Sequence, residues 1–206
     1  MTAAALLPYE MHIVAKTFLE CSKNWECTFQ TIIDSNLLQK NKLSTLKREL
    51  FELRDRLQNL TQKEVEYLAN GYYTTEISFL AIIKTYSLIQ EFVLEVLRNK
   101  KLLFDNILLE SDWNNFIESK KAQHQQLSDL SASTLKKIKQ VIFKILKDAK
   151  IIAISGKQKE IQTPYIDQKL MQLICEDNPK LLQYFLLSDS DIKTICRDNN
   201  EHHEKI

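Results

Sequence analysis

Glycine and proline are scarce in this chain of 206 residues. It has two glycines, Gly71 and Gly156, and three prolines, Pro8, Pro164 and Pro179, whereas a typical protein carries about 7% and about 5% of these residues. Folds with many tight turns, such as β-sandwiches and β-barrels, depend on both residue types. Loops that cradle phosphates depend on glycine, and no GxxxxGK[ST], GxGxxG or GxSxG motif occurs. We therefore expect a mainly helical protein without a nucleotide-binding loop.

Cysteine and histidine are also few, and their spacing matches no metal site. The four cysteines, Cys21, Cys27, Cys175 and Cys196, lack a CxxC pair, and the four histidines lack an HExxH pair. We interpret the cysteines as reduced thiols that pack in the interior of a cytoplasmic protein. The sequence predicts no metal, no cofactor, no small-molecule substrate and no catalytic residues, so we do not expect an enzyme.

Long hydrophobic runs are missing as well. The N-terminus, MTAAALLPYEMH, has neither the basic residues nor the apolar length of a signal peptide. The most apolar stretch, 77–97, is interrupted by Lys84, Glu91 and Glu95, which argues against a membrane span. These absences favour a cytoplasmic location and no membrane partner.

Apolar residues recur every three or four positions along most of the chain, the spacing of amphipathic helices. Ser44 is a candidate N-cap, and Thr61 with Glu64 forms a capping box for a short helix that ends at Gly71. A buried central helix is expected over 74–99, and a β-hairpin with its turn near residues 155–158 follows a helix capped by Ser131 or Ser133. The other expected helices cover residues 10–20, 25–34, 44–60, 111–122, 166–175, 179–187 and 190–197, with a loop over 123–132.

The order of these elements predicts a multi-helix bundle with one small hairpin in its C-terminal half. We divide the chain into an N-terminal helical bundle (1–109), a helical winged-helix-like region (110–197) and a frayed polar tail (198–206). Whether the first two regions are separate domains or one continuous core stays open at this point.

Positive charge is concentrated in one segment. The whole chain has 28 Lys and Arg against 27 Asp and Glu, a formal net charge of +1. Residues 133–159, however, contain eight lysines and one acid, Asp148, a local net charge of +7. On a helical wheel the polar side carries Ser133, Lys136, Lys137, Gln140, Lys144 and Lys147, and the apolar side carries Leu135, Ile138, Val141, Ile142, Ile145 and Ala149.

A helix followed by a two-stranded ribbon is the order found in winged-helix DNA-binding modules. There the helix enters the major groove, and here Lys157 and Lys159 would bring the ribbon to the backbone. Because the segment lacks arginine, the usual reader of guanine, we expect mainly non-specific binding to double-stranded DNA. An ordinary solvated helix face is the alternative interpretation, and the loop before this helix is longer than a standard helix-turn-helix allows.

A second group of basic residues, on the helix after Ser44, has two interpretations as well. It comprises Lys42, Lys47, Arg48 and Arg54. These residues form either a secondary anion-binding surface or a solvated helix face, and the i,i+4 pairs of Arg48 with Glu52 and Glu52 with Arg56 favour the latter.

The succession of these segments resembles the BrxA family, the small A component of bacterial BREX phage-defence systems. The resemblance rests on Trp25, the IIDSN stretch from Ile32, LSTLKRELFELRDRL from Leu43, EFVLEVLRNK from Glu91, SDWNNFIESK from Ser111 and STLKKIKQVIFKILKDAKII from Ser133. It covers residues 10–187. It implies a helical fold similar to that of the RNA-binding antitermination factor NusB, DNA binding, and work beside larger BREX proteins that methylate host DNA and exclude phage. It implies no catalytic residues.

Our leading hypothesis is a non-enzymatic, double-stranded DNA-binding accessory protein of bacterial anti-phage (BREX) defence. One alternative is a protein-interaction adaptor that docks other BREX subunits, with nucleic acid incidental. A second alternative is an RNA-binding protein of the NusB type.

Overall fold

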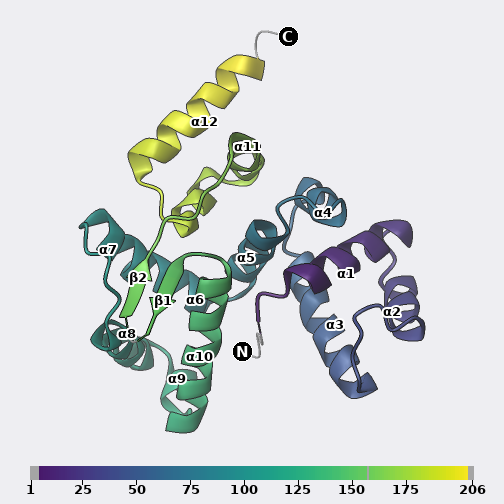
Figure 1. Cartoon of the computed structure of the whole chain (residues 1–206), viewed down its shortest axis with the longest axis horizontal. Coiled ribbons are helices and arrows are strands. Elements are labelled where there is room, and N and C mark those ends of the chain that lie inside the picture. The colour runs from purple at the N-terminus through teal and green to yellow at the C-terminus, as the bar shows by residue number, and fades with distance from the viewer. Residues whose placement is uncertain (1–4, 157, 204–206) are drawn as a thin grey trace. The chain divides into compact units, whose positions relative to one another are not determined.

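The computed structural model of the chain describes residues 5–156 and 158–203. Over these residues the regular structure is helical except for one antiparallel two-stranded hairpin (Figure 1). The predicted fold class, mainly α with one small hairpin, is confirmed. The chain clusters into two compact units that divide between Tyr86 and Ser87, whereas we expected a boundary at 109/110. A compact unit need not fold independently, so the predicted division into domains stays a prediction.

The N-terminal unit, Leu6–Tyr86, is built around its first helix. Helix α1 packs against each of the other four helices of the unit. It buries Met11, Val14 and Ala15, and helix α3 adds a buried stripe of leucines at 46, 50, 53 and 57. The helices are α1 (Pro8–Glu20), α2 (Trp25–Asp34), α3 (Leu43–Leu57), α4 (Gln62–Ala69) and α5 (Thr74–Thr85).

Local signals placed most of these helix ends correctly. The capping box at α4 is present: the Glu64 amide donates to Thr61 Oγ1 at 3.3 Å, and the Thr61 amide donates to Glu64 Oε2 at 2.7 Å. Gly71 follows α4 with φ +78°, the left-handed conformation that favours glycine. The expected Ser44 cap is wrong, because α3 begins at Leu43, and Lys42, two residues before Ser44, occupies the N-cap position without a side-chain hydrogen bond.

The expectation of one central helix over 74–99 is wrong. Helix α5 ends at Thr85, and Tyr86 adopts extended backbone with φ −121° and ψ 101°. The Tyr86 hydroxyl donates to Glu52 Oε1 at 3.3 Å, and the Arg56 guanidinium lies 5.7 Å from its ring centre. These contacts with α3 hold Tyr86 in the N-terminal unit. They are tertiary contacts, so the helix break that they cause could not be predicted from the spacing of apolar residues.

The C-terminal unit contains the described residues from Ser87 onward, together with Ala5. Two short elements, α9 and the 3-10 helix η2, replace an expected loop and an expected α-helix, and α12 is longer than expected. The elements are α6 (Ser87–Phe92), the π-helix η1 (Val93–Arg98), α7 (Asn99–Leu102), α8 (Glu110–Gln123), α9 (Gln125–Ser128), α10 (Ala132–Asp148), β1 (Ile152–Ser155), β2 (Gln158–Ile161), α11 (Gln168–Asp177), η2 (Pro179–Phe185) and α12 (Asp189–His203).

An aromatic cluster forms part of the core of this unit. Phe92 has no exposed surface. Its ring centre lies 5.1 Å from those of Trp113 and Phe116 and 5.9 Å from that of Phe143. The cluster therefore joins α6, α8 and α10, and it fixes which side of α10 faces inward.

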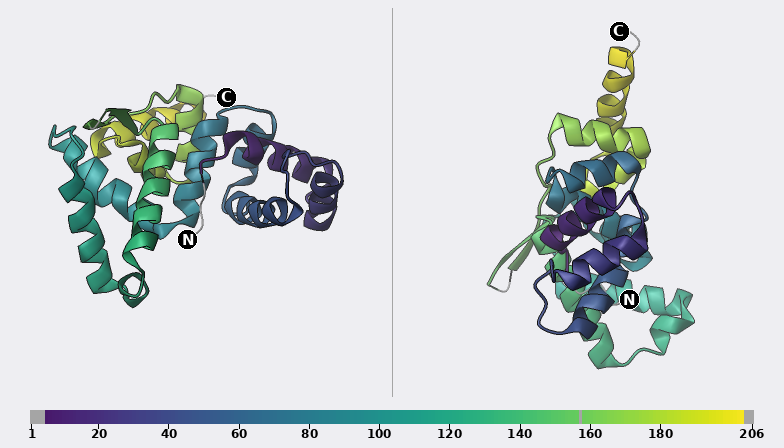
Figure 2. Two further views of the ribbon diagram at one scale, coloured as in Figure 1. Left: turned by 60° about the horizontal axis from the view of Figure 1, so that its bottom comes forward. Right: turned by 90° about the vertical axis from the view of Figure 1, so that its right-hand side faces the viewer.

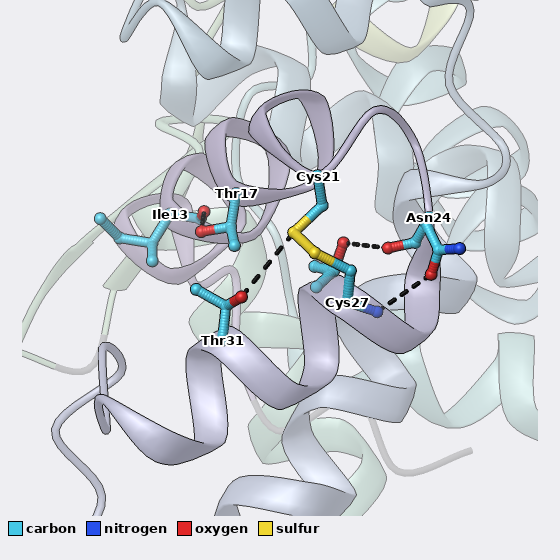
Figure 3. The surroundings of a disulfide bond; sticks show 7 residues. Ile13, Thr17, Cys21, Asn24, Cys27 and Thr31 are labelled. Atoms are coloured by element: carbon cyan, nitrogen blue, oxygen red, sulfur yellow. Dashed lines mark hydrogen bonds between the residues drawn. A yellow bond between two sulfur atoms is a disulfide. The ribbon is translucent and has the colours of Figure 1, made fainter.

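The prediction of four reduced, buried cysteines is wrong. The structure pairs Cys21 with Cys27 and Cys175 with Cys196, with Cα atoms 5.8 and 5.7 Å apart. Figure 3 shows the first pair at the corner between α1 and α2, where the Asn24 side chain accepts a hydrogen bond of 3.0 Å from the Cys27 amide. Cys27 is exposed. The corner brings the two thiols together, and the sequence spacing alone did not reveal it.

Among the described residues, no single helix is both long and apolar enough to cross a membrane. Only Thr74–Thr85 and Ser87–Leu102 taken together, across a sharp bend, reach that length and composition. Their apolar residues are largely buried, as in the core helices of many proteins.

Candidate nucleic-acid interface

Helix α10 is the element that carries the lysine-rich segment. Its N-terminus is capped by Ser131, whose Oγ accepts a hydrogen bond of 3.2 Å from the Thr134 amide. Its inner side buries Ile142, Phe143, Ile145 and Leu146. Three of the predicted apolar positions, Leu135, Ile138 and Val141, are only half-buried, because the aromatic cluster draws in the side of the helix that bears Phe143.

The outer side of α10 carries the predicted polar residues. All six are exposed: Ser133, Lys136, Lys137, Gln140, Lys144 and Lys147. Within the part of the chain that the structure describes, no carboxylate pairs with the four lysines of this set. We call Lys136, Lys137, Lys144 and Lys147 the lysine face. An unneutralised row of ammonium groups on one side of a helix is an electrostatic footprint for a polyanion.

The hairpin follows α10 directly and packs against it. Strand β1 pairs antiparallel with β2, with Ile152 opposite Ile161 and Ser155 opposite Gln158. In the right-hand view of Figure 2 the two strands project from the body of their unit. Of the two lysines predicted to bind DNA from this ribbon, Lys157 lies outside the described residues, and Lys159 is half-buried.

A third short segment extends the hairpin, and the sequence analysis missed it. The Leu108 amide donates to the Lys159 carbonyl at 2.9 Å, and the Ile161 amide donates to the Asn106 carbonyl at 2.8 Å. Ile107 completes an antiparallel bridge with Glu160. The apolar run Ile107-Leu108-Leu109 was the available signal. The spatial order is therefore 106–108, β2, β1, with α8, α9 and α10 between the first segment and the hairpin in the chain.

Lys139 and Lys159 differ from the lysine face in that both contact other groups. The Lys139 ammonium forms an ion pair with Glu110 and lies 6.0 Å from the Trp113 ring centre. Burial lowers the pKa of Lys139, and the positive charge of Lys159 lowers it further. Lys159 lies 5.7 Å from the Phe143 ring centre. These two side chains connect α10, α8 and β2.

A groove of about 440 Å³ lies between α8 and α10. Figure 2 shows these two helices as neighbours that α9 links at one end. Trp113, Ile117 and Leu135 form an apolar part of the groove wall, and Lys136 and Lys139 are also among its lining residues. The groove thus borders the lysine face along one side of α10.

The secondary basic group lies on and next to α3 in the N-terminal unit. Lys42, Lys47 and Arg48 are exposed. Arg54 is half-buried, forms an ion pair of 3.0 Å with Asp55, and has its guanidinium 5.1 Å from the Phe51 ring centre. Arg54 is therefore already neutralised, so the group offers less free charge than its four basic residues suggest.

Among the described residues, no group of three or more His, Cys, Asp or Glu side chains is placed to hold a metal ion. The positions His202 and His203 fall in α12, in a stretch whose side chains the structure does not describe.

Comparison with known proteins identifies relatives along most of the chain. A BREX protein BrxA from Bacillus cereus (strain H3081.97) is 27% identical over 144 residues, which cover 69% of this chain and 72% of the relative. A BREX protein BrxA from Escherichia coli O9:H4 (strain HS) is 24% identical over 165 residues, covering 78% of this chain and 76% of the relative.

A similar fold occurs among solved structures. The crystal structure of an uncharacterized protein from Magnetospirillum magneticum aligns with a TM-score of 0.75 at 20% identity, over 89% of this chain and 94% of that chain. At this identity the likeness concerns the fold alone. The family model described as BrxA matches residues 1–178. The chain therefore belongs to the BrxA family of BREX phage-defence systems.

Proposed function

We propose that this protein is a non-enzymatic accessory component of a BREX system that binds double-stranded DNA in the cytoplasm. The observation that carries the proposal is the lysine face: four exposed lysines on one side of α10, none of them paired with a carboxylate in the described chain. Lysines of this kind contact phosphates, the part of DNA that dominates affinity.

The connectivity around α10 supports a winged-helix interpretation. The C-terminal unit runs from a helical segment to the 106–108 segment, then through α8 and α10 to β1 and β2, and the 106–108 segment pairs with β2. A winged-helix module has this order of elements, with the helix before the hairpin in the major groove. In this arrangement Gln140 and Ser133 on α10 would face the base edges, and the hairpin would follow the backbone.

The binding is mainly non-specific in this proposal. Residues 133–159 contain no arginine, and bidentate contacts to guanine come mostly from arginine. If the protein neutralises six phosphates, the slope of log affinity against log salt is about −5.

A titration with a random-sequence DNA duplex tests the proposal. We expect that the joint substitution Lys137→Glu, Lys144→Glu and Lys147→Glu abolishes binding at low salt. The matched control is Lys169→Glu, Lys180→Glu and Lys193→Glu, which makes the same change in net charge at exposed lysines of the same unit. Equal loss of affinity in both variants would mean that binding depends on net charge alone. Unchanged affinity in the first variant would show that the lysine face is not the DNA-binding surface. Competition with structured RNA separates this proposal from binding of the NusB type.

A second candidate function, an adaptor for other BREX proteins, is favoured by an exposed apolar loop. Phe104 is 91% exposed and Leu103 is 77% exposed. Leu102, Ile107 and Leu109 are exposed beside them in the sequence, and exposed apolar patches commonly mark protein interfaces. The substitutions Leu103→Ser and Phe104→Ser should prevent co-purification with co-expressed BREX proteins but leave DNA affinity unchanged. Retained co-purification would exclude this loop as the docking surface.

A further inference from the structure

Two lysines from different elements each lie near the Phe143 ring at the junction of α10 and the hairpin. The Lys139 ammonium lies 5.5 Å from the Phe143 ring centre, and the Lys159 ammonium lies 5.7 Å from the same centre. Both lysines are half-buried, whereas the four lysines of the lysine face are exposed. Packing near Phe143 therefore restricts the two ammonium groups, whereas exposed lysine side chains move freely in solvent.

This cluster holds more positive than negative charge. Glu110, at the start of α8, forms an ion pair with Lys139. Within the described chain, Lys159 has no ion pair. The Glu110 carboxylate therefore balances only one of the two positive charges, and the charge of Lys159 still acts on Lys139. A group with more than one negative charge would neutralise the cluster better than Glu110 does.

The Glu110 side chain can move away from Lys139 into solvent. It is 63% exposed, although it lines the groove between α8 and α10. Moving the Glu110 carboxylate into water costs little, because ion pairs of solvent-exposed carboxylates contribute little to stability. Lys136 of the lysine face lines the same groove, so an anion that enters beside Lys139 meets a second cation.

We propose that Lys139 and Lys159 form a phosphate-binding position at the junction of α10 and the hairpin, and that the Glu110 carboxylate occupies it in the free protein. This inference rests on the proposed DNA binding and adds two points to it. Lys139, which the helical wheel left out of the site, contacts the DNA backbone. Glu110 competes with the backbone phosphate and weakens binding.

Salt titrations of duplex affinity test the proposal. Lys139→Gln and Lys159→Gln should each weaken binding and reduce the magnitude of the salt slope by about 0.9, the amount for one lost phosphate contact. Glu110→Gln should tighten binding roughly twofold to fivefold, which corresponds to the exposed ion pair that it removes. In the Lys139→Gln background, Glu110→Gln should change nothing.

Two control variants separate the site from general effects of charge and folding. Glu118→Gln removes an exposed glutamate of the same helix that pairs with Lys121, and it should leave affinity unchanged. Lys139→Arg keeps the charge and should restore the slope lost in Lys139→Gln.

Three results would overturn the proposal. They are equal tightening by Glu118→Gln and Glu110→Gln, an unchanged slope in Lys139→Gln, and additive effects of Glu110→Gln and Lys139→Gln. Each of these results can be obtained only if the unmodified protein binds duplex DNA. Any of them would therefore overturn this inference and leave the proposed function in place. If the unmodified protein ignores duplex at low salt, the proposed function and this inference both fail.

Discussion

The Arg98 guanidinium donates a hydrogen bond of 2.8 Å to the Asp189 carboxylate, 91 positions along the chain. It also donates to the Leu187 carbonyl at 3.1 Å. Arg98 lies in η1 and its side chain is only 10% exposed, while Asp189 begins α12. One arginine thus ties the C-terminal helices to the middle of their own unit.

We predict that Arg98→Met lowers the free energy of unfolding by about 1–3 kcal/mol. Methionine replaces the aliphatic part of the arginine side chain but leaves the Leu187 carbonyl without its hydrogen-bond donor. A buried polar group that loses its partner costs about 1–3 kcal/mol. Urea denaturation measures the difference. Arg197→Met, at an exposed arginine of α12, is the control and should change the free energy by about 0.5 kcal/mol or less.

Acid should weaken the same connection. A hydrogen bond from Gln183 and the charge of Arg98 lower the pKa of Asp189 below 3.8. A carboxyl whose pKa is lower in the folded state stabilises the protein above its unfolded pKa, and the effect is lost as pH falls through the folded value. As the pH is lowered below about 4, the free energy of unfolding should therefore fall less steeply in Asp189→Asn than in the unmodified protein. Denaturation curves at several acidic pH values measure this, and parallel pH profiles would contradict it.

Lys120 is the buried cation of α8, and its loss should destabilise the C-terminal unit. Its ammonium lies 2.7 Å from Glu95 Oε1 and 2.9 Å from Glu91 Oε2. Lys120→Met should lower the free energy of unfolding by about 1–3 kcal/mol, less than for a fully buried pair because both glutamates stay partly in water. Lys121→Met, at an exposed pair with Glu118, should cost less than about 0.5 kcal/mol.

The pH dependence of the Lys120 contribution has the opposite sign to that of Asp189. Burial alone would lower the pKa of Lys120, but its hydrogen bonds to Glu95 and Glu91 outweigh burial and raise the pKa above 10.5. The contribution is complete below pH 10.5 and is lost as pH rises through the folded value. The difference in stability between Lys120→Met and the unmodified protein should therefore shrink in strong alkali.

The Cys175–Cys196 disulfide should stabilise the protein by about 3 kcal/mol, because it closes a long loop of the unfolded chain. Its cysteines are 21 positions apart and join α11 to α12. Reduction, or Cys175→Ser with Cys196→Ser, should lower the melting temperature. Cys21–Cys27, only six positions apart, should contribute less, about 2 kcal/mol. A melting temperature that reductant leaves unchanged, with both cysteines then open to alkylation, would contradict this prediction.

Phe92 should be among the most sensitive positions of the C-terminal unit. Phe92→Ala removes a ring that contacts Trp113, Phe116 and Phe143, and such substitutions cost about 3–5 kcal/mol. Phe104→Ala offers a matched control, since that ring is 91% exposed and its loss should cost about 0.5 kcal/mol or less. Chemical denaturation of both variants measures the contrast, and similar losses would contradict it.

Local features of this chain could be predicted wherever neighbours in the sequence supply the stabilising groups. The capping box of Thr61 and Glu64, the left-handed Gly71 and the cap at Ser131 all depend on residues within four positions of each other. The exposed side of α10 was also predictable, because the 3.6-residue period separates its lysines from its apolar residues.

Features that depend on distant residues were missed or wrong. The break at Tyr86 follows from contacts with Glu52 and Arg56. The pairing of 106–108 with β2 joins segments some fifty positions apart. The disulfides form where the fold brings two sulfur atoms together, at the corner between α1 and α2 and at the contact between α11 and α12. Patterns in a single sequence describe neighbouring residues and therefore cannot predict any of these long-range contacts.

By itself, the sequence determined the helical class of the protein, from its few glycines and prolines, and the concentration of lysine in one amphipathic segment. Only the tertiary structure decided which lysines are free. It left Lys137, Lys144 and Lys147 in solvent and drew Lys139 toward Glu110 and Phe143. The reason is that periodicity fixes the angle of a side chain about its own helix axis, whereas its partners come from whichever elements pack against that helix.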